Sequence, residues 1–162
     1  MNKNENGVTL TVLVIIIIVL LIIASISITL GTETIKNAGF ESVKTNMLLI
    51  QAKVKECVEE ANFKKGKETI ISNEVLNCLK GSKCNDTDIA SLPEEVKNTT
   101  GLIYKCTDSE FAQMGLKDVK ADKYLIIYNI DNATADIVYK EGVEHDSKTY
   151  YTLSSIEESN FK

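Results

Sequence analysis

The most apolar part of the chain is a stretch near its N-terminus, residues 8–30. No charged side chain occurs there, and its only polar residues are threonines and serines. As a helix it spans about 34 Å, enough to cross the hydrocarbon core of a bilayer. Its many isoleucines and valines favour a strand by themselves, but a strand of this length has no place in a small domain. A buried core helix and a cleavable secretory signal are weaker interpretations, because the chain is too short to surround the stretch and a signal's apolar region has only about 7–15 residues. We therefore expect a transmembrane helix.

The pattern changes after Gly31, but it remains helical. Apolar side chains recur at steps of three and four, and lysines and glutamates fill the other positions. This amphipathic continuation covers residues 31–63 and should end near Lys64-Lys65-Gly66, where lysines suit the helix C-terminus and glycine suits the cap. Its apolar stripe consists of Ile35, Phe40, Val43, Met47, Ile50, Val54, Cys57, Val58 and Ala61.

The remaining residues, 64–162, have the pattern of a small α+β head. Short helices are expected after Ser72 and after Ser91, with Ser91 as the cap and Pro93 in the first turn. Residues 108–115 suggest a further helical turn. Strands are expected at 102–106, 123–130, 135–140 and 148–154, with a turn at 142–147 between the last two. The predicted fold class is thus α+β, with a long N-terminal helix, half transmembrane and half amphipathic, packed on a C-terminal antiparallel sheet.

The composition argues against several classes of function. All 18 basic residues are lysines and the net charge is −5, so an acidic, arginine-free chain is not expected to bind nucleic acid. The single histidine, His145, excludes a multi-histidine metal site and is expected in a solvated loop. No nucleophile–base pair and no nucleotide-binding motif is found, so we expect neither an enzyme nor a bound cofactor. Four aspartates are assigned to turn capping rather than calcium binding: Asp86, Asp88, Asp131 and Asp136.

Four cysteines follow the apolar stretch: Cys57, Cys78, Cys84 and Cys106. Their even number favours disulfides over a metal site, because no Cys-x-x-Cys pair is present. Three connectivities are possible. We expect Cys78–Cys84, which closes a short loop, and Cys57–Cys106, which would join the helix's inner stripe to the end of a strand.

The junction of the polar leader with the apolar stretch resembles the N-terminus of type IV pilins and pseudopilins. The family pattern there is Gly-Phe-Thr-Leu-Ile-Glu, and Gly7, Thr9 and Leu10 match it in register. Val8 stands in place of the phenylalanine, and Val12 in place of the glutamate. The resemblance covers about residues 1–30.

This resemblance implies a structural role. A prepilin peptidase would remove the leader, residues 1–7, by cutting between Gly7 and Val8, and the new N-terminal Val8 would be N-methylated. The helix of residues 8–30 would then assemble with other pilin-like subunits. The protein would be a bacterial single-pass cell-membrane protein with an extracytoplasmic head. After processing it would be a subunit of a type IV pilus, a type II secretion system or a competence-like filament.

The absent glutamate leaves three interpretations open. In the family, that carboxylate is thought to neutralise the N-terminal amine of a neighbouring subunit, and Val12 cannot do so. The chain would then be a tip or minor subunit, or belong to a lineage that packs without the pair. The third interpretation is a single-pass membrane-anchored protein that presents a small extracytoplasmic binding head.

Overall fold

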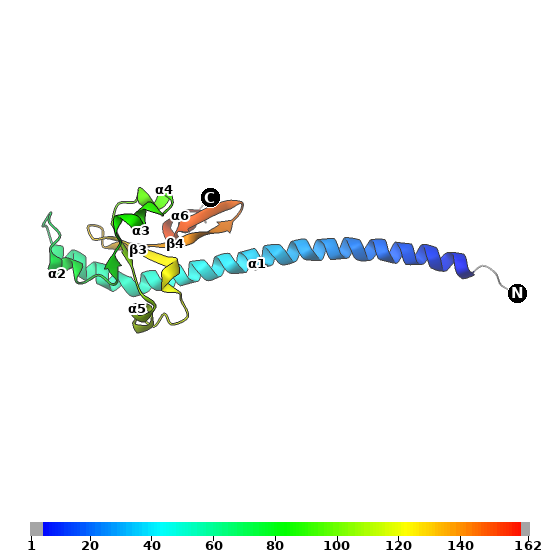
Figure 1. The fold of residues 1–162 in the computed structure, drawn as a ribbon, viewed down its shortest axis with the longest axis horizontal. Helices are drawn as coiled ribbons and strands as arrows, with labels where there is room; N and C mark the ends of the chain where they lie inside the picture. Colours follow the sequence, from blue (N-terminus) through cyan, green and yellow to red (C-terminus); the bar gives the residue numbers. More distant parts are fainter. Residues whose placement is uncertain (1–4, 160–162) are drawn as a thin grey trace. The chain divides into compact units, whose positions relative to one another are not determined.

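The computed structural model describes the backbone of residues 5–159 and the side chains of residues 12–22 and 34–159. The chain divides into two compact units, Met1–Ala38 and Gly39–Lys162. The first helix, α1 (Glu5–Lys65), contributes to both. Each unit is described by itself below (Figure 1).

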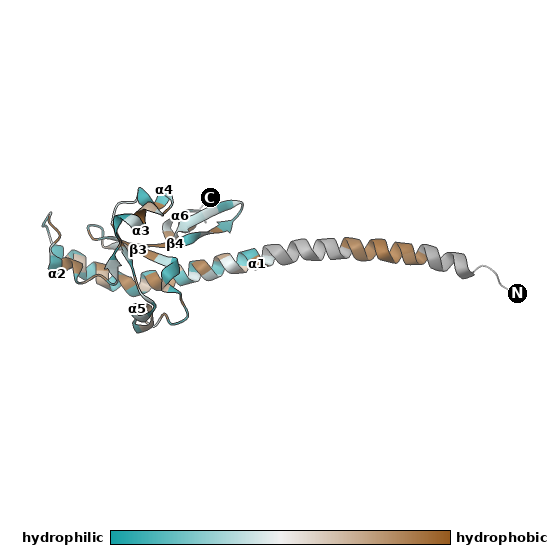
Figure 2. Ribbon diagram, viewed as in Figure 1, coloured by the Kyte–Doolittle hydropathy of each residue, from teal (hydrophilic) through white to brown (hydrophobic). Residues whose placement is uncertain are grey.

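In the first unit, the described side chains of α1 begin with an uninterrupted apolar stretch, residues 12–22 (Figure 2). Within the described residues, no helix carries an apolar run that is long enough to cross a membrane. This finding contradicts the transmembrane half of the predicted helix, residues 8–30. The described apolar side chains run only from Val12 to Ile22, whereas about 20 residues are needed to cross a bilayer.

In the second unit, α1 is amphipathic, as its pattern predicts. Its buried side chains are at most 2% exposed, and from Met47 onward they recur every three or four residues: Phe40, Met47, Ile50, Val54, Val58 and Ala61. The helix ends with Lys64 and Lys65 in its last turn. Gly66 follows in the left-handed conformation, with φ of 57°, and its N–H donates to the Asn62 carbonyl at 3.0 Å. The predicted helix end is confirmed.

The second unit also contains a five-stranded antiparallel sheet, in which each strand pairs with the next one along the chain. They are β1 (Ser82–Lys83), β2 (Leu102–Lys105), β3 (Tyr124–Asn129), β4 (Thr134–His145) and β5 (Lys148–Thr152). The antiparallel sheet is thus confirmed, with strand β4 longer than predicted.

The predicted turn at 142–147 is wrong in its extent. His145 pairs with Lys148 and Glu144 with Thr149, so only Asp146 and Ser147 form the loop. Their φ angles are 49° and 62°. Two residues with positive φ match the twist of a hairpin and allow the strands to pair up to the loop.

The remaining helices are short. They are α2 (Asn73–Leu76), α3 (Asp86–Ala90), α4 (Glu94–Lys97), α5 (Asp108–Gln113), η1 (Ala121–Lys123) and α6 (Leu153–Ser159). Ser72 caps α2 as predicted. Ser91 instead ends α3, and Pro93 occupies the cap position of α4. Residues 153–154 begin α6 rather than extending the last strand.

Both faces of the sheet are covered. Strand β3 has five consecutive buried residues, 124–128. Tyr124, Ile126 and Tyr128 belong to the apolar cluster that includes the α1 stripe. Leu125 and Ile127 belong to a second cluster with Leu92 and Val96. Because successive strand residues point to opposite faces, these two clusters lie on opposite sides of the sheet.

Candidate functional site

The first candidate site is the exposed apolar part of α1, residues 12–22, which we call the apolar segment. Every side chain in it is between 45% and 63% exposed. The segment makes about three helical turns, so its apolar surface extends around the whole helix. Uncovered apolar surface of this kind marks an interaction site, because water disfavours its exposure.

Val12, where the family pattern has a glutamate, is the first described side chain of the apolar segment and is 45% exposed. The predicted cleavage residues Gly7 and Val8 belong to the backbone of α1. The Val8 side chain lies outside the described residues, and the expected N-methylation of Val8 stays a prediction. Residues 1–4 of the predicted leader also lie outside them.

The second unit holds α1 against the sheet through polar side chains as well as through its apolar stripe. The Asn62 amide donates to the Ile130 carbonyl at 2.7 Å and to the Asp131 carbonyl at 3.2 Å. The Gln51 amide donates to the Ala135 carbonyl at 2.9 Å. These amides attach α1 to the backbone before and after the turn that joins β3 to β4. Sequence reasoning missed them, because an amide in an amphipathic helix has no distinguishing pattern.

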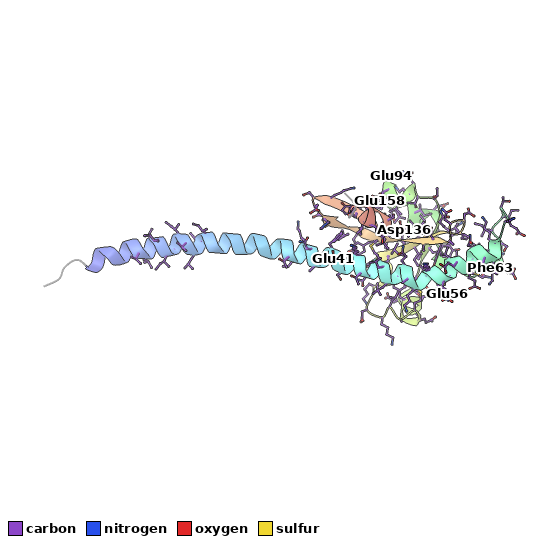
Figure 3. The ribbon with its side chains drawn as sticks, turned by 180° about the vertical axis from the view of Figure 1, so that it is seen from behind. Glu41, Glu56, Phe63, Glu94, Asp136 and Glu158 are labelled. Atoms are coloured by element: carbon purple, nitrogen blue, oxygen red, sulfur yellow. The ribbon has the colours of Figure 1, made fainter. Side chains whose placement is uncertain are left out.

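The opposite side of α1 in this unit is exposed. Glu41, Glu56 and Phe63 lie along it (Figure 3), and Phe63 is 86% exposed. Lys55 and Glu59 form an exposed ion pair one turn apart, at 3.8 Å. This side is therefore of mixed character, unlike the apolar segment.

The four predicted disulfide cysteines are free thiols in the structure. Cys106 belongs to the apolar cluster beneath α1, and the half-buried Cys78 packs against that cluster. Cys84 belongs to the cluster on the other face of the sheet. Cys78 and Cys84 therefore belong to clusters on opposite faces of the sheet. The structure joins neither the Cys78–Cys84 pair nor the Cys57–Cys106 pair in a disulfide, and both pairings remain predictions.

Three thiols have a raised pKa. Burial raises the pKa of Cys106 to about 12, and nearby Glu110 and Cys57 raise it further. Burial also raises the pKa of Cys57 and of Cys84. These thiols are predominantly protonated at neutral pH.

The predicted capping role is confirmed for Asp88, and the structure adds ion pairs that were not predicted. Asp88 completes a capping box with Asn85 and pairs with Lys105 at 2.7 Å, which lowers its pKa. Asp131 pairs with Lys65. The Asp136 carboxylate accepts hydrogen bonds from the Ser154 hydroxyl at 2.6 Å and the Ser154 N–H at 3.1 Å. Asp86 lies in the first turn of α3.

His145 is not in a solvated loop, and that prediction is wrong. It ends β4, and its ring stacks on Phe40 of α1 with centroids 4.1 Å apart. The sequence did not indicate this stacking, because residues 142–147 were assigned to a turn, whereas β4 continues to His145.

A depression of about 370 Å³ is lined in part by Ile127, on the sheet face opposite α1. Its lining carries a single ionisable side chain, Asp136, whose carboxylate is already bound by Ser154. The other lining residues are Asn98, Thr99, Thr100, Ile127, Asn129 and Thr134. Over the described residues, no group of three or more His, Cys, Asp or Glu side chains is arranged to hold a metal ion.

Comparison with known proteins identifies no relative. A scan against protein-family models gives no match, and searches of curated proteins and of solved structures find no similar chain.

Proposed function

We propose that this protein is a pilin-like structural subunit, trimmed between Gly7 and Val8 and assembled with other pilin-like subunits through its apolar segment. One observation carries the proposal: the fully apolar, exposed residues 12–22 belong to the same helix that docks, from Phe40 onward, on an antiparallel sheet. A helix with one apolar end and one end fixed to a folded unit suits repeated association of identical or similar subunits.

The energetics favour assembly. Full burial of one large aliphatic side chain contributes about 1.5–3 kcal/mol. The apolar segment is about half exposed, so covering it contributes on the order of 10 kcal/mol. Association costs about 4–15 kcal/mol in lost freedom. Burial therefore offsets that cost when each segment contacts several neighbours, as in a filament.

The identity of residue 12 is relevant to where the subunit lies in a filament. A carboxylate at this place could neutralise the N-terminal amine of a neighbour, and an unpaired buried charge is costly by several kcal/mol. Val12 cannot neutralise such an amine. A subunit with Val12 therefore suits a tip or minor position, where no N-terminal amine of a neighbouring subunit needs to be neutralised. A lineage that packs without the charge pair is the other possibility, and subunit counts per filament separate the two.

The direct test of processing is the mass and the N-terminal residue of the protein recovered from cells that produce it. We expect Val8 as the first residue, bearing one methyl group. In Gly7→Leu the leader should remain, because a residue without a side chain allows a close approach to the scissile bond. Gly39→Leu is the matched control, since its added Cβ meets no atom within 4 Å, and it should be trimmed normally. A wild-type chain that retains residues 2–7 would overturn the proposal.

Assembly through the apolar segment is tested separately. Ile18→Asp places a charge in the middle of the segment and should prevent incorporation into filaments. Phe63→Asp makes the same kind of change at an exposed apolar side chain at the far end of α1, and it should be incorporated like the wild type. Equal incorporation of both variants would show that the segment is not the assembly surface.

A further inference from the structure

The depression beside Ile127 is lined by four side chains from two neighbouring strands. Ile127 of β3 pairs with Asp136 of β4, and Asn129 pairs with Thr134. Residues that pair across two antiparallel strands, or that lie two positions apart in one strand, point to the same face of a sheet. These four side chains therefore form one patch, and all of them line the depression. Its volume of about 370 Å³ is within the range of small-molecule sites.

The loop between α4 and β2 supplies the other lining side chains, residues 98–100. Gly101 allows this loop to lie close to β3. Its φ is 152°, and a Cβ at this position would lie 2.7 Å from Ile127 Cγ2 and 3.0 Å from the Tyr128 carbonyl oxygen. A residue with a side chain would therefore push the loop away from the strand, and the depression depends on glycine here.

The Asp136 carboxylate in this depression is held by three hydrogen bonds. Its Oδ1 accepts from the N–H groups of Ile137 at 2.9 Å and of Ser154 at 3.1 Å, and its Oδ2 accepts from the Ser154 hydroxyl at 2.6 Å. An ionised carboxylate has about four lone-pair positions. One acceptor position therefore remains, on Oδ2, and its orientation is already fixed.

Two further lining side chains are held in the same way. The Asn129 Oδ1 accepts from the Asn132 N–H at 3.1 Å, which leaves the Asn129 NH₂ group as a donor. The Thr99 hydroxyl donates to the Val96 carbonyl at 2.7 Å, so its oxygen is left to accept. Polar groups that are fixed before a ligand arrives lower the cost of ordering them on binding.

This arrangement suits a ligand with several hydroxyl groups. A hydroxyl both donates and accepts, so neighbouring hydroxyls can donate to Asp136 and accept from Asn129. These two residues are diagonal neighbours in the β3–β4 register, about 7–8 Å apart, within reach of one small ligand. Among the described lining residues there is one carboxylate and no cationic side chain, which disfavours an anionic ligand. Ile127 supplies apolar surface for C–H groups.

We propose that this depression binds a neutral saccharide. Asp136, Asn129 and Thr99 are its fixed hydrogen-bond partners, and the Thr134 hydroxyl is an adaptable one. The proposal goes beyond the pilin-like role and does not depend on it, because assembly uses the apolar segment. Failure of either proposal leaves the other standing.

The test uses the full chain in a detergent without a sugar headgroup. Saturation-transfer NMR detects which ligand protons contact the protein. The probes are the methyl glycosides of glucose, galactose and mannose, each compared with its uronic acid counterpart. We expect at least one neutral probe to bind with a Kd on the order of 1 mM, as suits a small open site. Its uronic acid should bind at least about tenfold more weakly, because Asp136 repels a second carboxylate.

Variants then locate the site. Thr134→Val keeps the size of the side chain but removes its hydroxyl, and it should weaken binding about three- to tenfold. Asp136→Asn removes the charged acceptor and should weaken binding about tenfold or more. The matched control is Thr149→Val, at an exposed threonine of β5 that does not line the depression, and it should bind like the wild type.

Thr134→Val leaves the hydrogen bonds of Asp136 in place, so it decides the test if Asp136→Asn does not fold. Three results would overturn the proposal. They are unchanged binding in Thr134→Val, equal affinity for a sugar and its uronic acid, and no saturation transfer to any neutral probe at about tenfold the expected Kd.

Discussion

Two adjacent residues of α1 have opposite environments. Ile50 is fully buried, whereas Leu49, about 100° further round the helix, is 46% exposed. Both are large aliphatic residues, so their hydrophobicity alone does not distinguish them. The difference comes only from their position in the helical period.

Truncating these two side chains should therefore have unequal effects. Ile50→Ala removes buried methylene groups and leaves a cavity, so it should lower the free energy of unfolding by about 2–5 kcal/mol. Leu49→Ala, the matched control, should change it by about 0.5 kcal/mol. Urea unfolding of the two variants measures the difference. Equal losses would mean that Leu49 is also buried in solution.

Because of Cys106, the free energy of unfolding should change with pH in the alkaline range. Burial raises its pKa to about 12, so the folded state favours the neutral thiol. The resulting stabilisation is fully present below the thiol's ordinary pKa of about 9 and is lost as the pH rises toward 12. The buried Tyr128, whose pKa is also raised, acts in the same direction.

Under reducing conditions, Cys106→Ala should flatten this dependence. Its free energy of unfolding should fall less steeply than that of the wild type between pH 9 and 12. The control is Cys78→Ala, at a half-buried thiol, which should keep the wild-type slope. Urea titrations at a series of pH values provide the measurement, and parallel curves for the wild type and Cys106→Ala would refute the assignment.

At the level of elements, the β4–β5 hairpin depends on unusual backbone angles. Asp146 and Ser147 form its loop with φ of 49° and 62°. Gly142, with φ of 69°, lies where the pairing of β4 with β5 shifts register between Val138 and Val143. A left-handed conformation costs a residue with a Cβ about 1–2 kcal/mol, and glycine avoids that cost.

Ser147→Gly and Gly142→Ala should change the free energy of unfolding in opposite directions. Ser147→Gly should raise the free energy of unfolding by about 0.5–1 kcal/mol, since it relieves a left-handed serine. Gly142→Ala should lower it by about 2 kcal/mol, because the new Cβ would lie 2.7 Å from both Thr149 Cγ2 and Tyr151 Cε1. Thermal unfolding of both variants gives the signs. A stabilising Gly142→Ala would show that the shift in register is absent in solution.

The elements with a strong period were predictable from the sequence, and those set by tertiary contacts were not. The helix to Lys65 follows from its repeated apolar positions, and strand β3 from its short run of aromatic and aliphatic residues. Helix α6 was missed because its seven residues follow directly from a strand and make too few turns to show a helical period. Strand β1 has only two residues and depends on pairing with β2.

The same limit applies to the candidate sites. The sequence alone shows that the apolar segment consists of apolar residues. The structure adds that their side chains are exposed. The structure places Cys78 and Cys84 in different clusters, because closeness in sequence does not determine which face of a sheet each side chain reaches. Strand β1 lies between them in the chain and brings Cys84 to the face opposite Cys78.

At the scale of the whole molecule, none of the side chains described before Phe40 belongs to either apolar cluster. A fragment of residues 34–162 should therefore fold alone and stay monomeric, since it lacks the apolar segment. We expect a cooperative urea transition and an elution volume of a monomer, whereas the full chain should self-associate. A fragment without a cooperative transition would show that residues before Thr34 contribute to the fold.

The buried stripe of α1 has a consequence for synthesis on the ribosome. The stripe, residues 40–61, is made first, and the side chains that cover it are made later, ending with Leu153 and Ile156 of α6. At about 5–20 residues per second, translation needs about 5–20 s to pass from Ala61 to Ile156. During that interval the nascent chain exposes the stripe as well as the apolar segment, and it stays a ligand for chaperones until its last helix has left the exit tunnel.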